Sequence, residues 1–281
     1  MNAIEINGLT KSYDDFKLDS ITMNIPKGSI VGLVGENGAG KTTTINLIMD
    51  AIKRDSGSVK VLGIDNKDKR FTRLKNDIGI VLDEAYYPEI LNANDVNRIM
   101  KHTYYNWDER IYYEYINRFH LPTNKKFKDY SRGMKMKLAI SVAMSHNAKL
   151  LILDEATSGL DPMVRDEVLQ IFNEFTRDEE KTVLLSSHIV SDLEKICDYI
   201  AFIHKGRLIF MEEKDRVLND YSLINISKDS VLDIPDEAIV GVRENKYSTE
   251  LLVKKELVNK SFKSEHFTLE DIILFMAKEA E

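Results

Sequence analysis

The sequence predicts an α/β fold built around a mostly parallel sheet. Short apolar runs recur along the chain, and several stretches between them have the composition and spacing of helices. Alternation of this kind favours parallel strands, because each helix crosses back over the sheet before the next strand begins. A chain of 281 residues, of which 43% are apolar and 30% charged, is long enough for one such domain and a smaller additional part.

Five apolar runs have the length of buried strands. They are rich in Val, Ile, Leu and Phe, as expected for strands covered on both faces. A helix is expected soon after the first run, and a second helix is expected after Asp161-Pro162, where an acidic first turn follows. The predicted strands are residues 29–34, 77–82, 149–154, 182–187 and 199–203, and the two helices are residues 43–52 and 163–180.

Residues 90–148 interrupt this alternation and are interpreted as an inserted helical subdomain. The segment is rich in aromatic residues, and packing inside the subdomain explains most residues of this kind. Adjacent aromatic pairs cannot all face one way on a helix, so an exposed minority could contact a partner. The aromatic residues are Tyr104, Tyr105, Trp107, Tyr112, Tyr113, Tyr115 and Phe119.

From about residue 219 the sequence changes character again. Residues 230–240 and 248–257 resemble strands, and residues 268–281 form an amphipathic pattern typical of a helix. The sequence therefore predicts a main domain over residues 1–218 and a small α+β appendage over residues 219–281. This appendage could brace the main domain, regulate it or mediate dimerisation.

Composition excludes several classes of function. The formal net charge is −7 and no long basic block is present, which argues against a nucleic-acid surface. The single cysteine, Cys197, cannot form an internal disulfide, and no paired CxxC motif suggests a zinc site. We expect a reducing cytosolic environment, no signal peptide and no membrane-spanning segment.

Residues 35–43, GENGAGKTT, match the phosphate-binding P-loop pattern in its expected place between a strand and a helix. Backbone N–H groups of a glycine-rich turn can converge on a polyphosphate, and the start of the helix adds a favourable dipole. Lys41 is expected to reach the β- and γ-phosphates, Thr42 to bind Mg²⁺ and Thr43 to contact the α-phosphate. The predicted nucleotide-binding residues here are Gly35, Glu36, Asn37, Gly38, Ala39, Gly40, Lys41, Thr42 and Thr43.

Acidic and imidazole groups follow two later strands. Asp154 and Glu155 end the strand 149–154, and His188 follows the strand 182–187. Because parallel strands end at the same edge of a sheet, Asp154 is expected to hold Mg²⁺ and Glu155 to polarise a water molecule. At that edge His188 could contact a γ-phosphate. The alternative is that the acidic pair only begins a loop and that the histidine is structural.

Four motifs in order resemble the ATP-binding subunit of ABC transporters over residues 1–218. They are GENGAGKTT, DYSRGMKMKLAISVAM at 129–144, LILDEATSGLD at 151–161 and LLSSH at 184–188. This resemblance implies additional N-terminal antiparallel strands and an ATPase that uses ATP and Mg²⁺. It also implies that Tyr13 stacks on adenine and that Asp161 belongs to the nucleotide site.

The resemblance further implies that the subunit acts as a head-to-tail pair. In such a pair, Ser131 and Gly133 of each subunit cover the γ-phosphate held by the other subunit, which is most simply a second identical chain. A separate membrane permease is the other expected partner, so the subunit would lie at the cytoplasmic face of the membrane. The groove between the Asp83 loop and the helical subdomain would dock the permease, with Tyr86, Tyr87 and Pro88 as contacts.

Two positions depart from the family pattern. The usual LSGGQ segment reads YSRGM, so that Arg132 either adds a cation near the shared phosphate or points to solvent. Asp83 stands where the family usually has glutamine, and a carboxylate brings extra negative charge towards a triphosphate. Asp83 is therefore a less secure Mg²⁺ ligand than Thr42 or Asp154.

The leading functional hypothesis is an exporter-type ATPase subunit similar to those of antimicrobial or amphipathic peptide exporters. One alternative is a soluble ABC-type ATPase acting on ribosomes or nucleic acid, which the acidic charge and the single ATPase cassette disfavour. Another is a GTPase or a small-molecule kinase. The nearest match to a guanine-reading NKxD motif, residues 66–69, lacks the final aspartate.

Overall fold

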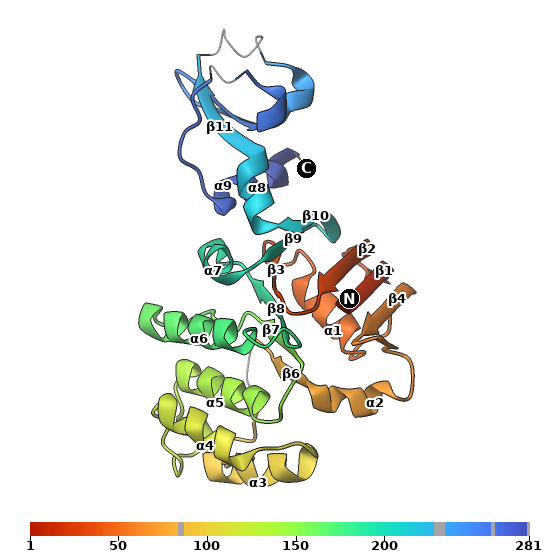
Figure 1. Ribbon diagram of the computed structural model, residues 1–281, viewed down its shortest axis with the longest axis vertical. Helices are drawn as coiled ribbons and strands as arrows, with labels where there is room; N and C mark the ends of the chain where they lie inside the picture. Colours follow the sequence, from red (N-terminus) through yellow and green to blue (C-terminus); the bar gives the residue numbers. More distant parts are fainter. Residues whose placement is uncertain (84–86, 228–233, 260–261, 280–281) are drawn as a thin grey trace.

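The computed structural model describes residues 1–83, 87–227, 234–259 and 262–279. Along the long axis of the molecule, a helical region lies at one end, two sheets occupy the middle and a third sheet lies at the other end (Figure 1). Within the described residues, no helix is both long enough and apolar enough to cross a lipid bilayer.

The central sheet has six strands in the order β10-β9-β3-β8-β7-β6, and all five predicted strands are in it. Five of the strands are parallel, and only β10 runs antiparallel to its neighbour β9. Strands β3, β7 and β8 are buried along their whole length, which explains their continuous apolar sequences. The strands are β3 (Ile30–Val34), β6 (Ile78–Val81), β7 (Leu150–Asp154), β8 (Thr182–Ser187), β9 (Tyr199–His204) and β10 (Arg207–Glu213).

An antiparallel sheet in the order β2-β1-β4-β5 covers one side of the central sheet, as the resemblance implies. Its apolar side chains share one core with α1 and with β3, so α1 is held between apolar surfaces. Helix α1 ends four residues before the predicted end, and Asp50 has the left-handed φ of 53° where the chain turns. The elements are β1 (Asn2–Ser12), β2 (Lys17–Pro26), α1 (Lys41–Ile48), β4 (Ser56–Val61), β5 (Ile64–Asp65) and α2 (Phe71–Leu74).

The helical region consists of α3 (Ala93–Thr103), α4 (Glu109–Arg118) and α5 (Arg132–Met144), all within the predicted range 90–148. Each helix begins at a residue whose side chain accepts a backbone hydrogen bond: Asn92, Asp108 and Ser131.

The aromatic residues of this region mostly form its core, as expected. Tyr112 is fully buried and its hydroxyl donates to the Ala93 carbonyl at 2.9 Å. Phe119 is also buried, whereas the Tyr105 side chain is 67% exposed.

Helices α6 (Pro162–Phe175) and α7 (Val190–Ile196) complete the main domain. After them, α8 (Lys214–Asp220) leads into an antiparallel sheet in the order β11-β13-β12, which begins at Tyr221, close to the predicted boundary at residue 219. The expected strand at 230–240 is described only from residue 234, and β12 begins at Ile239. The strands are β11 (Tyr221–Ile226), β12 (Ile239–Glu244) and β13 (Thr249–Lys254).

Helix α9 (Leu269–Glu279) joins the appendage to the main domain. It packs on β12 and α7, and its buried residues Leu269, Ile272 and Phe275 belong to the same apolar core as Leu193 of α7. Gly241 permits this packing, because a Cβ there would lie 3.0 Å from the Phe275 Cβ. The appendage and the main domain therefore share one apolar core.

His146 provides a pH-dependent contribution to stability in the helical region. Its Nδ1–H donates to the Asn76 carbonyl at 2.9 Å, its ring stacks on Tyr104 at 4.0 Å, and burial lowers its pKa. As the pH falls, the unfolded chain therefore binds a proton at this residue at a higher pH than the folded chain does. Stability from the neutral ring should be fully present above a pH of about 6.5 and should decrease below it.

We expect acidification from pH 7.5 to 5.5 to destabilise the wild-type chain by about 1 kcal/mol more than the His146→Gln variant. The free energy of unfolding, measured in denaturant at both pH values, tests this. His102→Gln, at an exposed position of α3, is the matched control and should keep the wild-type pH dependence. If the free energy of unfolding had the same pH dependence in the wild type and in His146→Gln, the assignment of this effect to His146 would be wrong.

Candidate functional site

The glycine-rich loop lies between β3 and α1 and depends on the absence of side chains at two positions. A Cβ at Gly35 would lie 2.3 Å from the Ile203 carbonyl oxygen, which no side chain tolerates. Gly40 has a φ of 114°, and a Cβ there would lie 2.9 Å from Leu18 and 3.0 Å from Phe16. The loop therefore packs closely on β9 and β2 while its outer residues remain exposed. The exposed residues are Glu36, Asn37 and Gly38.

Lys41 lies inside this loop. Its side chain is 5% exposed, and its ammonium group donates to the carbonyls of Gly35 at 2.8 Å and Glu36 at 3.3 Å. The same nitrogen lies 3.2 Å from Glu155 Oε1, although this ion pair does not have hydrogen-bond geometry. The first N–H groups of α1 have no intrahelical acceptor, so the loop offers both a cation and free donors. This arrangement fits a polyphosphate.

The other residues predicted in the loop have distinct positions. Thr42 is exposed at the first turn of α1, and Thr43 is half-buried. Ala39 is buried and its carbonyl accepts from Gly206 N–H at 2.9 Å, which fixes the loop against the turn after β9. Glu36 Oε1 lies 3.4 Å from Nδ1 of the buried His204.

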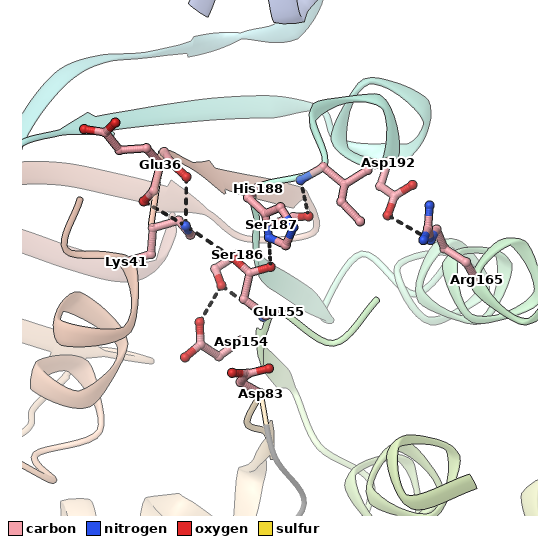
Figure 2. Close-up of polar contacts among 12 residues, drawn as sticks. Glu36, Lys41, Asp83, Asp154, Glu155, Arg165, Ser186, Ser187, His188 and Asp192 are labelled. Atoms are coloured by element: carbon pink, nitrogen blue, oxygen red, sulfur yellow. Dashed lines mark hydrogen bonds and ion pairs between the residues drawn. The ribbon is translucent and has the colours of Figure 1, made fainter. Parts of the chain in front are cut away.

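Asp154 ends β7 at the carboxyl edge of the sheet and is 1% exposed. The Ser186 hydroxyl on β8 donates to Asp154 Oδ1 at 2.5 Å and accepts from the Glu155 N–H at 3.1 Å (Figure 2). Ser186 therefore orients the Asp154 carboxylate. The sequence contains Ser186, but its contact with Asp154 arises only because β7 pairs with β8.

Glu155 occupies a strained position between two basic groups. Its φ of 51° is unusual for a residue other than glycine, and strained backbone of this kind concentrates at functional sites. Its Oε1 faces Lys41 and is buried with no hydrogen-bond partner in the described part of the chain. Its Oε2 lies 2.7 Å from Nδ1 of His188 (Figure 2). The three side chains form a continuous polar contact from the glycine-rich loop to the end of β8.

His188 is 43% exposed and lies just before α7. Ser187 supports the turn between them, because its hydroxyl accepts from the Ile189 N–H at 2.9 Å. A neutral histidine that donates from Nδ1 to Glu155 leaves Nε2 available to a ligand. The ring can therefore link Glu155 to a group bound at this edge.

A Mg²⁺ site at this edge would need oxygen atoms from a bound ligand in addition to those of the chain. Within the described residues, no group of three His, Cys, Asp or Glu side chains is arranged to hold a metal. Mg²⁺ often uses one or two protein oxygens together with phosphate oxygens, so the buried Asp154 carboxylate and the exposed Thr42 hydroxyl fit this cation. Asp83 is exposed, and it follows β6, whose last residue Val81 pairs with Leu153, the residue before Asp154.

The TSGLD segment is connected to helix α7 by a pair of residues that the sequence did not reveal. Asp161 begins α6, and its carboxylate accepts from the Val164 N–H at 3.1 Å. Arg165 donates to the Leu160 carbonyl at 3.1 Å, and its Nε lies 3.8 Å from the buried Asp192 of α7. The sequence shows only that the acidic residue Asp192 stands beside the apolar residue Leu193.

Ser131 and Gly133 lie at the exposed start of α5, and their contacts are local. The Ser131 hydroxyl accepts from the Met134 N–H at 3.2 Å. A Cβ at Gly133 would lie 3.6 Å from Leu160, an ordinary contact distance. Arg132 does not point only to solvent, because its Nη2 lies 3.1 Å from Asp83 Oδ1.

Tyr13 follows β1, and its side chain is 48% exposed. The Lys11 Nζ lies 5.6 Å from the centroid of the Tyr13 ring, and the centroids of the Tyr13 and Phe16 rings are 6.4 Å apart. Because the side chain is half exposed, the ring is accessible at the edge of the site. Phe16 lines a cavity of about 360 Å³ together with Glu36, Asn37 and Gly38. The structure thus adds Phe16 as a second aromatic residue beside the glycine-rich loop.

Comparison with known proteins agrees with this geometry. The family model described as ABC transporter matches residues 18–158. The chain is 34% identical over 225 residues to the lantibiotic transport ATP-binding protein SrtF of Streptococcus pyogenes, covering 79% of this chain and 96% of SrtF. It is 32% identical over 244 residues to the bacitracin transport ATP-binding protein BcrA of Bacillus licheniformis, covering 82% of this chain and 78% of BcrA.

Solved structures show the same fold. An ATP-binding subunit of an ABC transporter is 26% identical, with a TM-score of 0.69 over 77% of this chain and 92% of that chain. A dimeric cassette, MJ0796 bound to ADP and Pi, is 22% identical, with a TM-score of 0.67 over 75% of this chain and 98% of that chain. Together with the glycine-rich loop and the Asp154–Glu155–His188 edge, these matches show that the chain belongs to the ABC transporter family, as an ATP-binding ATPase subunit.

Proposed function

We propose that Lys41, Asp154, Glu155 and His188 carry ATP hydrolysis at the carboxyl edge of the central sheet. The observation that supports this most directly is the continuous contact Lys41–Glu155–His188 beside the buried Asp154. When phosphates enter the loop, Lys41 would turn towards them and leave Glu155 Oε1 free to accept a proton from water.

The remaining residues of the site would position the nucleotide. Asp154 and Thr42 would hold Mg²⁺, which would neutralise phosphate charge when bound. His188 would keep Glu155 oriented through Nδ1 and contact the γ-phosphate through Nε2. Tyr13 would stack on adenine, with Phe16 beside it, and Asp161 would order the segment that borders the phosphates.

We propose that two copies of the chain close around ATP. Ser131 and Gly133 present a serine hydroxyl and the start of a helix, which together suit an anion. Ser131 is exposed and Gly133 is half-buried. A second chain placed head to tail would bring this helix start to the phosphates. The ligand would then contribute to the stability of the dimer.

The proposed partner in transport is a membrane permease, bound at the cytoplasmic face. Leu82, Pro88 and Ile90 expose apolar surface between β6 and α3, and Ile90 is 72% exposed. Tyr86 lies outside the described residues. Tyr87 is a weaker contact than expected, because it is half-buried against Phe127, with ring centroids 5.4 Å apart, and burial raises its pKa.

The cargo we propose is an exported peptide antibiotic or amphipathic peptide. This rests on the names of SrtF and BcrA, which describe lantibiotic and bacitracin transport. The alternative of a ribosome- or nucleic-acid-associated ATPase is not favoured by these relatives.

A hydrolysis-deficient Glu155→Gln chain should form dimers in Mg²⁺-ATP and remain monomeric without nucleotide, as measured by light scattering after gel filtration. Adding Gly133→Asp should prevent the dimer without abolishing nucleotide binding, because a carboxylate would then face the phosphates of the second chain. Gly133→Ala is the matched control and should still dimerise, since a Cβ there meets only an ordinary contact. A chain that stays monomeric in Mg²⁺-ATP, even with its permease present, would refute the pairing.

A further inference from the structure

Two residues that depart from the family pattern contact one another. Arg132, the first residue of α5, and Asp83, two residues after β6, are 49 positions apart in the sequence. The Arg132 Nη2 lies 3.1 Å from Asp83 Oδ1, and each side chain is 56% exposed. The pair thus joins the helical subdomain to the edge of the central sheet that carries Asp154.

Arg132 also contacts the loop after β7. Gly159 has a φ of 70°, and a Cβ built there would lie 3.1 Å from Cζ and from Nη1 of Arg132. The guanidinium therefore lies against bare backbone two residues before Asp161. It contacts both the loop after β6 and the loop after β7.

The electrostatics of α5 explain why a carboxylate suits position 83. A cation at the start of a helix is unfavourable, because the helix dipole places partial positive charge there. The first turn of α5 contains no acidic residue, so the neutralising charge comes from Asp83 outside the helix. Asp83 and Arg132 thus compensate for one another.

We propose that Arg132 is a positioning residue that competes with Mg²⁺ for the Asp83 carboxylate. The Oδ1 atom that pairs with the guanidinium is one of the two oxygens that Asp83 can offer to a cation. Arrival of Mg²⁺ with nucleotide would draw Asp83 away from Arg132, so that Arg132 lowers the contribution of Mg²⁺ to nucleotide affinity. Because Ser131 and Gly133 flank Arg132, this exchange would link the metal position to the surface proposed to meet the second chain. The inference deepens the proposed function and rests on its nucleotide site.

The test compares the affinity for the non-hydrolysable ATP analogue adenylyl imidodiphosphate with Mg²⁺ and with EDTA, measured by calorimetry on dilute single chains. Arg132→Gln should raise the ratio of the affinity in Mg²⁺ to the affinity in EDTA by about 2- to 5-fold. This is the range expected for loss of an exposed ion pair. Arg132→Lys keeps the charge and should restore most of the wild-type ratio. Lys135→Gln, also in the first turns of α5, is the matched control and should leave the ratio unchanged.

The double variant decides between competition and a general structural effect. In an Asp83→Asn background, Arg132→Gln should no longer change the ratio, and high salt should abolish the difference between wild type and Arg132→Gln. An unchanged ratio in Arg132→Gln, or an equal rise in both backgrounds, would overturn the proposal. Absence of nucleotide binding in the wild-type chain would instead refute the proposed function, and failure to dimerise would leave this test intact.

Discussion

Glu155→Gln is expected to reduce ATP turnover by about 10²- to 10⁴-fold, which is the usual scale for loss of a general base. ATP binding should be preserved. The amide keeps the size of the side chain and can still accept from His188 Nδ1, which lies 2.7 Å from Oε2 in the wild-type chain. It cannot take a proton from water at neutral pH. Steady-state phosphate release and nucleotide binding, measured on the same preparation, separate the two effects.

The control for this variant is Glu174→Gln. Glu174 is also paired with a cation, Arg118 at 2.8 Å, but it lies near the end of α6 and far along the chain from the glycine-rich loop. Its turnover should match the wild type. Turnover at the wild-type rate in Glu155→Gln would remove Glu155 from the catalytic role.

Lys41→Ala is expected to abolish tight ATP binding, with a loss of affinity of about 10²-fold or more. The substitution removes the buried ammonium that donates to the Gly35 and Glu36 carbonyls and leaves Glu155 Oε1 without its neighbouring cation. The phosphates would then enter a site of net negative charge. Nucleotide titration by calorimetry measures the loss.

The structure predicts a partial rescue that a simple loss of folding would not produce. Lys41→Ala combined with Glu155→Gln should bind ATP more tightly than Lys41→Ala alone, because the uncompensated carboxylate is gone. Lys60→Ala, at an exposed position of β4, is the matched control and should bind as the wild type does. Wild-type affinity in Lys41→Ala would show that the glycine-rich loop is not the phosphate site.

Local chemistry made the central fold predictable. The buried parallel strands were recognisable because each is a short, continuous apolar run, and all five lie in the central sheet. Helix ends were less predictable, and the actual end of α1 depends on the left-handed backbone of Asp50. The exposed position of Tyr105 and the burial of Tyr112 depend on how α3 and α4 pack, which neighbouring residues in the sequence do not encode.

The sequence by itself determined the glycine-rich loop, the buried strand that precedes it and the acidic pair Asp154–Glu155. These features depend on backbone freedom and side-chain chemistry within a few residues. Only the tertiary structure decided that Ser186 holds Asp154, that Glu155 lies between Lys41 and His188, and that Arg132 pairs with Asp83. Contacts between distant segments depend on strand register and helix orientation, and those are set by the packing of the whole core.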